Sequence, residues 1–290
     1  MINYVKRKDI NIDKYDDCIE NSIQSRIYAF SWYLDIVADH WDVLVLDDYE
    51  AVMPLPWKSK FRVKYITQPY FCQQLGVFSK FELTKKNQQK FIKSISNKFI
   101  KTNLNFNSGN FCTSNMGKKV NYILKLNNSY ESLLKSFSKR RKRSVKAGEK
   151  NDLSIRNTTI LELIKIKKEF YNHIVFPETI IEKLSEYVII NDKGFVLGVF
   201  KDETLLGGSL FLNYNNRITY LFSSYNKEAR ALNASSLLIS TVIKQHQNSN
   251  FRLDFEGSNL LNIGSFFESF GAKNESYFHL EYTFFQKLFL

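Results

Sequence analysis

The hydrophobic pattern of the first 126 residues predicts a mixture of short helices and strands. Apolar positions one helical turn apart, such as Ile19 and Ile23, are typical of amphipathic helices, and Ser31 is a candidate N-cap. Continuous apolar runs are typical of buried strands. The elements predicted for this half are helices at 13–24, 31–37 and 85–99 and strands at 41–47, 50–57, 102–107 and 120–126.

The second half of the chain repeats this order in outline: a pair of helices, a meander of strands, a long helix, and a final strand, helix and strand. No clear sequence repeat accompanies it, so the duplication is inferred from the order of elements alone. The predicted elements are helices at 160–173, 177–187, 227–247 and 260–270 and strands at 153–156, 195–201, 205–213, 218–225, 251–256 and 273–286. The pattern predicts an α/β (α+β) protein with two similar domains.

Two carboxylates stand at the end of the strand predicted at 251–256. In such a strand Arg252, Asp254 and Glu256 share one face, and open α/β sheets bind their ligands at the carboxyl ends of strands. Asp254 and Glu256 are therefore candidates for a general base. The alternative is that they accept hydrogen bonds from the backbone of the turn at 257–259, or cap the next helix.

Residues 129–150 combine an apolar stripe with a dense run of cations. Ser129 and Ser132 are candidate N-caps and Gly148 is a candidate end, which predicts a helix here.

The positive charge of the chain is concentrated in this helix. The formal net charge is +12, from 41 Lys and Arg against 29 Asp and Glu, and six of the cations lie between residues 139 and 146. One concentrated run indicates a local anionic contact rather than a uniformly basic surface. Arg140, Arg141 and Arg143 are candidate ligands for phosphate oxygens. The alternative is a solvated basic helix that joins two domains.

Residues 65–78 combine aromatic rings and amide side chains around Pro69. Tyr70, Gln73 and Gln74 are candidates to line a polar pocket and bind a substrate. The alternative is that the amides satisfy buried backbone groups of the loop itself.

Several classes of site are not indicated by the sequence. The three cysteines form no CxxC pattern, and the four histidines have no metal-ligand spacing, so we expect reduced thiols and no metal site. The N-terminus has no apolar signal-like region, and no window approaches the 18 apolar residues of a membrane span. We expect a cytoplasmic protein. No helix-turn-helix or zinc-finger spacing supports DNA binding.

Three segments resemble the GCN5-related N-acetyltransferase (GNAT) superfamily, and the whole chain resembles its tandem, FemAB-like acyltransferases. The strand at 218–225 and the helix at 227–247 are similar to the pyrophosphate-loop strand and helix of the superfamily. The helix at 260–270 with Phe270-Gly271-Ala272 is similar to its terminal segment. Residues 138–156 are similar to the basic helix and strand that join the two halves of FemAB-like proteins. The first 126 residues are assigned by element order.

The resemblance implies two tandem GNAT-like domains, at 1–126 and 151–290, joined by a basic linking helix at 127–150. Each domain would hold a mixed, mostly antiparallel sheet flanked by helices. The implied activity is acyl transfer, such as N-acetyl transfer, from an activated donor to an amine. The implied donor is acyl-CoA or, alternatively, aminoacyl-tRNA. The acceptor would be a small molecule or a cell-wall precursor, bound in a cleft between the halves near the basic helix and residues 65–74.

The donor site implied by the resemblance surrounds residues 230–235, RALNAS. In a GNAT domain the pyrophosphate of CoA binds backbone N–H groups at a helix N-terminus. Leu232, Asn233 and Ala234 stand here in place of the usual glycines, which allow close approach of the phosphate. The candidate donor-binding residues are Ser223, Ser224, Arg230, Ala231, Asn233, Ala234 and Ser235.

The resemblance also implies a proton donor for the leaving group. Many GNAT enzymes use a tyrosine of the terminal helix, where this chain has Phe266 and Phe267, so Tyr225 or Tyr277 would have to act instead. The alternative function is that of a degenerate, non-catalytic GNAT-like module that binds RNA or a phosphorylated ligand through its basic helix.

Overall fold

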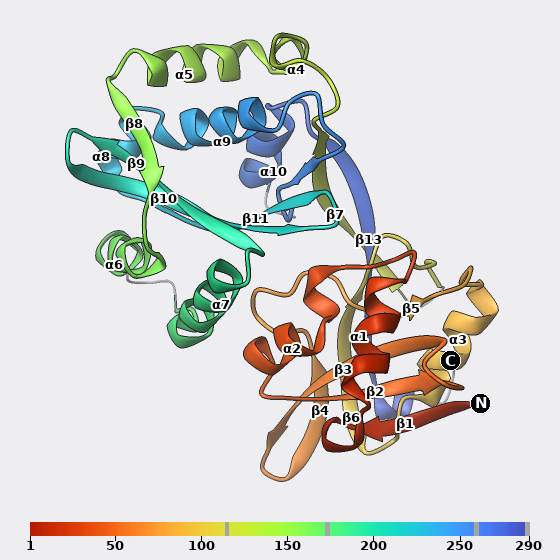
Figure 1. Ribbon diagram of the computed structural model, residues 1–290. Helices are drawn as coiled ribbons and strands as arrows, with labels where there is room; N and C mark the ends of the chain where they lie inside the picture. The colour runs from red at the N-terminus through yellow and green to blue at the C-terminus, as the bar shows by residue number, and fades with distance from the viewer. Residues whose placement is uncertain (114–115, 172–174, 258–260, 288–290) are drawn as a thin grey trace. The chain divides into compact units, whose positions relative to one another are not determined.

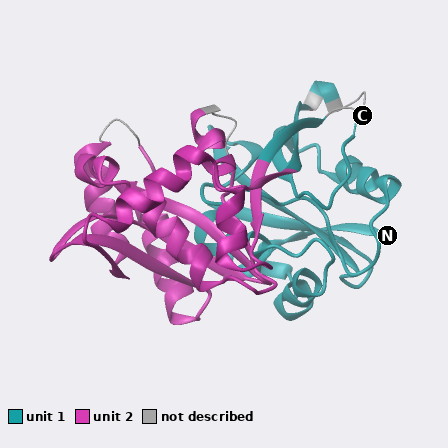
Figure 2. Cartoon of the chain, turned by 90° about the horizontal axis from the view of Figure 1, so that it is seen from above, with its two compact units in different colours: residues 1–120, 276–290 teal, residues 121–275 magenta. Residues whose placement is uncertain are grey.

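The structure, a computed structural model, describes residues 1–113, 116–171, 175–257 and 261–287 (Figure 1). The chain divides into two compact units, Met1–Val120 with Ser276–Leu290 and Asn121–Glu275 (Figure 2). Strands β7 (Met116–Lys125) and β13 (Lys273–Thr283) each run from one unit into the other. Most of β13 therefore belongs to the same unit as the N-terminal residues. The predicted domains, 1–126 and 151–290 with a linking helix at 127–150, place this strand in the second domain instead. That division stays a prediction.

The first unit contains a sheet in the order β1-β2-β3-β4-β6-β13, with the short β5 paired to β3. Neighbouring strands are antiparallel except β4 and β6. The elements are β1 (Ile2–Lys6), α1 (Ile12–Glu20), α2 (Ser31–Val37), β2 (His40–Leu46), β3 (Ala51–Lys60), β4 (Val63–Thr67), β5 (Phe78–Ser79), α3 (Lys85–Ser94), β6 (Phe99–Phe106) and α11 (Phe284–Lys287). Helix α1 packs on β3, α2 on β2 and α3 on β1.

The prolines of β3 lie where one side of the strand has no partner. Strand β3 pairs with β5 at Ala51 and Val52 and with β4 from Trp57 onward, so Pro54 and Pro56 fall between the two partners. A proline has no N–H for a ladder hydrogen bond, so it is tolerated at such a position. On its other side β3 pairs with β2 along this whole stretch, so it is an internal strand of the sheet and not an edge strand.

The second unit has a sheet in the order β7-β12-β11-β10-β9-β8, in which the β11–β12 pair is parallel. Its elements are α4 (Tyr130–Ser136), α5 (Lys139–Glu149), β8 (Leu153–Asn157), α6 (Ile160–Phe170), α7 (Glu178–Ile190), β9 (Gly194–Lys201), β10 (Thr204–Tyr214), β11 (Arg217–Tyr225), α8 (Lys227–Ala231), α9 (Ala234–Gln245), β12 (Arg252–Asp254) and α10 (Leu261–Glu268). Helices α6 and α7 cover one face of this sheet, and α9 covers the other, with α5 packed on α9 (Figure 1). These sheets and helices confirm the predicted fold class.

Two predicted helices are each divided in the structure. Within residues 129–150, α4 ends before Phe137, and Ser138 caps α5 by accepting the N–H of Arg141. Within residues 227–247, Asn233 separates α8 from α9. Periodic spacing continues across both interruptions, so the pattern alone does not reveal them.

Two details at the N-terminus also differ from the prediction. Strand β1 was not predicted, because Ile2–Lys6 carries only a short alternating pattern. Phe30, rather than Ser31, is the N-cap of α2, and the Ser31 hydroxyl donates instead to Asp16 of α1 at 2.6 Å.

No helix among the described residues is both long enough and apolar enough to span a membrane.

Candidate functional site

The N-terminus of α9 presents backbone N–H groups that have no acceptor. The N–H groups of Leu232 and Asn233 bond to carbonyls of the preceding turn, at 2.9 and 3.2 Å. Those of Ala234 and Ser235 have no acceptor among the described residues, and no side chain caps the helix. Free N–H groups and the positive end of the helix dipole make such a terminus an anion-binding site.

Asn233 gives the loop the conformation that a glycine would otherwise supply. Its φ of 59° lies in the left-handed region, which asparagine tolerates better than most residues because its short side chain can hydrogen-bond locally. Leu232 and Ala234 have ordinary φ values, so the loop needs this conformation at one position only. The absence of glycine therefore does not prevent the loop from exposing its N–H groups.

A cavity of about 630 Å³ opens at this helix terminus. Three arginines line it: Arg140 and Arg141 from α5 and Arg230 from α8. The rest of the lining comes from α5, from the start of α9, and from α10 with the turn that follows it. It is rich in hydroxyl and amide groups, from Ser138, Ser144, Asn233, Ser235, Ser236, Asn262, Ser265 and Ser269, and it also includes Phe266 and Glu268. The cavity thus combines positive charge with hydrogen-bond donors.

Arg141 is the most buried of these cations. Its guanidinium donates to the hydroxyl of Ser269 at 2.9 Å and to that of Ser236, and lies over the rings of Phe266 and Phe270 at 4.1 and 4.5 Å. Burial, with a smaller effect of neighbouring Arg140, lowers the pKa of Arg141 to about 10. No carboxylate pairs with it among the described residues. A partly desolvated charge without a counter-ion has a strong tendency to attract an anion.

Arg230 is exposed and held by an aromatic ring. Its guanidinium donates to the hydroxyl of Tyr171 and lies 4.9 Å from the centre of that ring. The Tyr171 hydroxyl in turn donates to the backbone carbonyl of Tyr225 at 3.0 Å. This chain of contacts fixes Arg230 to the end of β11.

Five of the predicted donor- and substrate-binding residues meet in this cavity: Arg140, Arg141, Arg230, Asn233 and Ser235. Ala234 is buried in the first turn of α9 and is not among the residues that line the cavity. The other predicted residues of this unit, Ser223, Ser224, Ala231 and Arg143, do not line it. Ser224 is buried on β11 with a hydroxyl that has no partner among the described residues. Their roles stay predictions.

Sequence reasoning missed Ser236, Glu268 and Ser269 as cavity residues. Ser236 lies on α9 and Ser269 in the turn after α10, and both accept hydrogen bonds from Arg141. Glu268 follows the helix-terminal aromatic pair, and it raises the pKa of Tyr122, although less than burial does. No sequence spacing links any of these residues to Arg141.

Asp254 is buried in an ion-pair cluster. Arg217 donates to Asp254, and to Glu275 at 3.1 and 3.2 Å. Burial lowers the pKa of Arg217, but Asp254 and Glu275 outweigh this effect and raise that pKa above its usual value. Asp254 also accepts the N–H of Glu256 at 2.8 Å. These contacts favour the structural alternative for Asp254, and its catalytic role stays a prediction.

Glu256 does not share a strand face with Asp254, and this part of the prediction is wrong. Strand β12 ends at Asp254, and Glu256 has a φ of 55°, in the left-handed region. Side chains alternate only along extended backbone. The remainder of the turn, Ser258 and Asn259, lies outside the described residues, as does Leu260, where the next helix was expected to begin.

The predicted proton donor Tyr225 is buried in the second unit. Its hydroxyl lies 3.0 Å from that of Ser209, and burial raises its pKa well above the usual value. Tyr277 is buried in the first unit. Neither tyrosine lines the cavity at α9, so a role in protonating a leaving group stays a prediction.

Tyr70, Gln73 and Gln74 belong to the first unit. Gln74 is buried, accepts the N–H of Ser108 at 3.0 Å and donates to Gln73 at 2.6 Å. The backbone carbonyl of Gln73 accepts the Asn105 amide at 2.9 Å, whereas Tyr70 is exposed. These bonds fit the alternative in which the amides form hydrogen bonds with buried backbone groups. Substrate binding by the three residues stays a prediction.

Comparison with known proteins gives matches in structure only. No protein-family model matches the sequence, and no curated protein matches it. Among solved structures, FemX matches with a TM-score of 0.68 and 11% identity, over 97% of this chain and 98% of FemX. A conserved protein of unknown function from Bacteroides thetaiotaomicron VPI-5482 matches with a TM-score of 0.61 and 11% identity, over 96% and 99% of the two chains.

A third match is L-PGS from Bacillus licheniformis, with a TM-score of 0.53 and 10% identity, over 92% of this chain and 90% of that one. At such identities a likeness concerns the fold and not the activity. Because the FemX match spans nearly the whole length of both chains, it includes the first 126 residues, which sequence motifs did not reach. The chain has the tandem GNAT-like fold of FemAB-like proteins.

Proposed function

We propose that this protein transfers an acyl or aminoacyl group from an activated donor to an amine, and that the cavity at the N-terminus of α9 binds a phosphate group of the donor. The observation that carries the proposal is the partly buried Arg141 guanidinium without a carboxylate partner, in the same cavity as the uncapped start of α9. Phosphate oxygens fit both groups, because they accept backbone N–H bonds and match a guanidinium fork.

The fold supports this choice of reaction. FemX and L-PGS are proteins of this fold, and a GNAT-like domain places a helix N-terminus after its central strand, as β11 and α9 do here. In the proposed reaction the amine nitrogen attacks the donor carbonyl. A C–N bond forms, the C–S bond of a thioester or the C–O bond of an aminoacyl ester breaks, and the amine loses a proton to a base. Acyl-CoA and aminoacyl-tRNA both carry the phosphates that the cavity would bind.

A thermal-shift experiment tests the donor. The full chain is heated with acetyl-CoA, a longer acyl-CoA, free CoA and deacylated tRNA. A ligand that binds only the folded state at roughly a hundredfold excess over its Kd raises the Tm by roughly 5 °C or more. We expect such a shift with the CoA compounds or with tRNA. If no compound shifts the Tm, a phosphate-bearing donor is not a ligand of this protein.

Two arginines of α5 provide a matched pair for this experiment. Arg140 and Arg143 are both exposed on the same helix, but only Arg140 lines the cavity. We expect Arg140→Gln to weaken donor binding about threefold to tenfold, the effect of one exposed charged contact, and Arg143→Gln to leave it unchanged. Equal weakening by both variants would indicate a diffuse electrostatic effect instead of a site.

The alternative function is non-catalytic binding of RNA or a phosphorylated ligand in the same cavity. The buried ion pair between Asp254 and Arg217 favours this alternative, because it gives one of the two predicted bases a structural partner. Turnover distinguishes the two functions. Incubation with a radiolabelled donor and a mixture of amines yields labelled amide only if the protein is a transferase, whereas binding alone leaves the donor intact.

A further inference from the structure

A second cavity, of about 620 Å³, lies elsewhere in the second unit. The end of β7, the start of α4, β12 and the start of β13 form its walls. None of its lining residues belongs to the cavity at α9, so the two are separate. Its volume is in the range of pockets that hold small molecules.

Three cations line this cavity: Lys125 on β7, Arg252 on β12 and Lys273 on β13. None of them forms an ion pair within the described residues. Glu275 also lines the cavity, but its carboxylate accepts two bonds from Arg217. The lining therefore has an excess of positive charge.

The sheet register makes this arrangement costly for the protein. Lys125 lies directly opposite Arg252 in the antiparallel β7–β12 pair, and Arg252 is the register partner of Arg217 in the β11–β12 pair. A row of cations thus crosses three neighbouring strands. Arg217 has two carboxylate partners, Asp254 and Glu275, whereas Arg252 and Lys125 have none among the described residues. Lys125 and Arg252 remain opposite each other, and like charges directly opposite in a sheet are destabilising.

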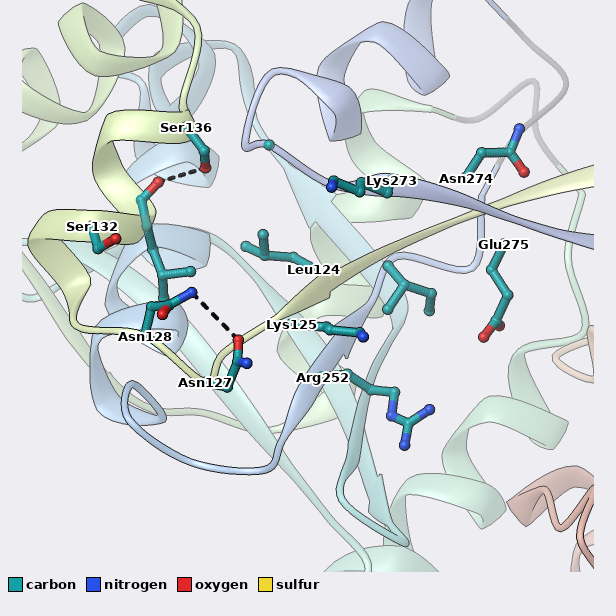
Figure 3. Close-up of a pocket in the computed structure, with 13 residues that line it drawn as sticks. Leu124, Lys125, Asn127, Asn128, Ser132, Ser136, Arg252, Lys273, Asn274 and Glu275 are labelled. Atoms are coloured by element: carbon teal, nitrogen blue, oxygen red, sulfur yellow. Dashed lines mark hydrogen bonds between the residues drawn. The ribbon is translucent and has the colours of Figure 1, made fainter.

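The side chains leave room for a ligand. Figure 3 shows Lys125 and Arg252 extending to the same side from neighbouring strands, with Glu275 beyond them. Asn127 and Ser132 add an amide and a hydroxyl on the side of α4. An anion between the cations would relieve their repulsion, and the neighbouring polar groups would bond to the rest of a polar ligand.

We infer that this cavity is a second anion site, which binds the phosphate or pyrophosphate group of a small polar ligand through Lys125, Arg252 and Lys273. Arg252 presents a planar fork that matches two phosphate oxygens, and the two lysines add mobile charges. The inference is independent of the proposed acyl transfer, because it uses no residue of the α9 cavity.

Calorimetric titration of the full chain with inorganic pyrophosphate at low ionic strength tests the inference. We expect two bound pyrophosphates per chain, one in each cavity. The double variant Arg252→Gln, Lys273→Gln should lose one of them, Arg141→Gln should lose the other, and Lys146→Gln, an exposed α5 residue outside both cavities, should lose neither.

The outcomes separate this inference from the proposed function. If Arg141→Gln removes a bound pyrophosphate and the double variant removes none, the donor site is supported and the second site is overturned. If the double variant removes a bound pyrophosphate and Arg141→Gln removes none, the second site is supported and the donor site is overturned. Binding that all three variants weaken equally would show general attraction to a basic protein, and would also overturn the inference.

A stability measurement gives a second criterion. Without ligand, Lys125→Gln removes the cross-strand repulsion and should raise the Tm by roughly 2 °C. Addition of pyrophosphate should raise the Tm of the wild-type protein more than that of the variant. A variant that is less stable than wild type without ligand would show that Lys125 has a structural role, and would contradict the inference.

Discussion

Two arginines of the second unit are withdrawn from water in different ways. Arg217 is buried between Asp254 and Glu275, which raise its pKa despite its burial. Arg141 is partly buried among serine hydroxyls and phenylalanine rings, and its pKa falls to about 10. The first guanidinium has its counter-ions within the chain. The second has only neutral partners among the described residues, which is why we propose a donor phosphate as its counter-ion.

The difference is the one expected between a structural ion-pair cluster and an anion-binding site within one unit. A buried cation whose counter-ions lie within the chain is part of the structure, and removing one counter-ion weakens the compensation of its charge. A partly buried charge that lacks a partner makes little contribution to folding but gives affinity for an anion. Three substitutions and one pH titration test this comparison.

The largest effect is expected for Asp254→Asn, which removes one counter-ion of Arg217 but keeps the shape of the side chain. The variant should lose about 2 kcal/mol of unfolding free energy, because a buried charged hydrogen bond is lost while Glu275 still pairs with Arg217. Urea denaturation followed by circular dichroism measures the loss. Glu203→Gln, which breaks the exposed pair with Arg156, is the control and should cause little change.

Arg141→Gln should give the opposite pattern. Its unfolding free energy should change by no more than about 1 kcal/mol, because a desolvated charge and its neutral contacts are removed together. Binding of the donor should weaken roughly tenfold to a hundredfold, the effect of losing a charged hydrogen-bonded contact. A variant that unfolds easily but binds normally would make Arg141 a structural residue like Arg217.

Ser269→Asp would make Arg141 resemble Arg217. The Ser269 hydroxyl accepts the Nε–H of Arg141 at 2.9 Å, so an aspartate there would supply the missing carboxylate. We expect the variant to be about 1 kcal/mol more stable and to bind the donor about tenfold more weakly, because the carboxylate competes with phosphate. Stronger donor binding would contradict the role given to the Arg141 charge.

The smallest effect is a pH dependence. Because folding lowers the pKa of Arg141 to about 10, the unfolded chain binds more protons than the folded chain between this value and the higher, ordinary pKa of arginine. Arg141 therefore makes the protein more stable as the pH rises through this window. Anion binding needs the charged form, so pyrophosphate affinity at the α9 cavity should fall as the pH rises through about 10. The Ser269→Asp variant should shift this fall to higher pH.

The fold was more predictable from the sequence than the site was. Alternating and helical spacing is local, so it located most strands and helices, and the order of elements was sufficient to indicate the tandem arrangement. The break at Asn233 was missed, because its left-handed backbone lies within an otherwise periodic helix. The same break gives α9 a free N-terminus, so the feature that makes the site was the one that periodicity concealed.

The two carboxylates show a further limit. Asp254 and Glu256 are two residues apart, which suggests a shared face, but the strand ends between them. Arg217, the partner of Asp254, is 37 positions away and is brought close by the parallel pairing of β11 and β12. Similarly, the contacts of Arg141 with Ser236 and Ser269 join α5 to α9 and to the turn after α10. Such contacts depend on tertiary packing, which residue spacing does not encode.

The most direct test is a calorimetric titration of the wild-type protein and the Arg141→Gln variant with acetyl-CoA and with deacylated tRNA, at the same ionic strength. The account predicts that at least one of these ligands binds the wild-type chain and binds the variant at least about tenfold more weakly. Equal affinity of both proteins for every ligand that binds, or binding of neither ligand to the wild-type chain, would contradict it.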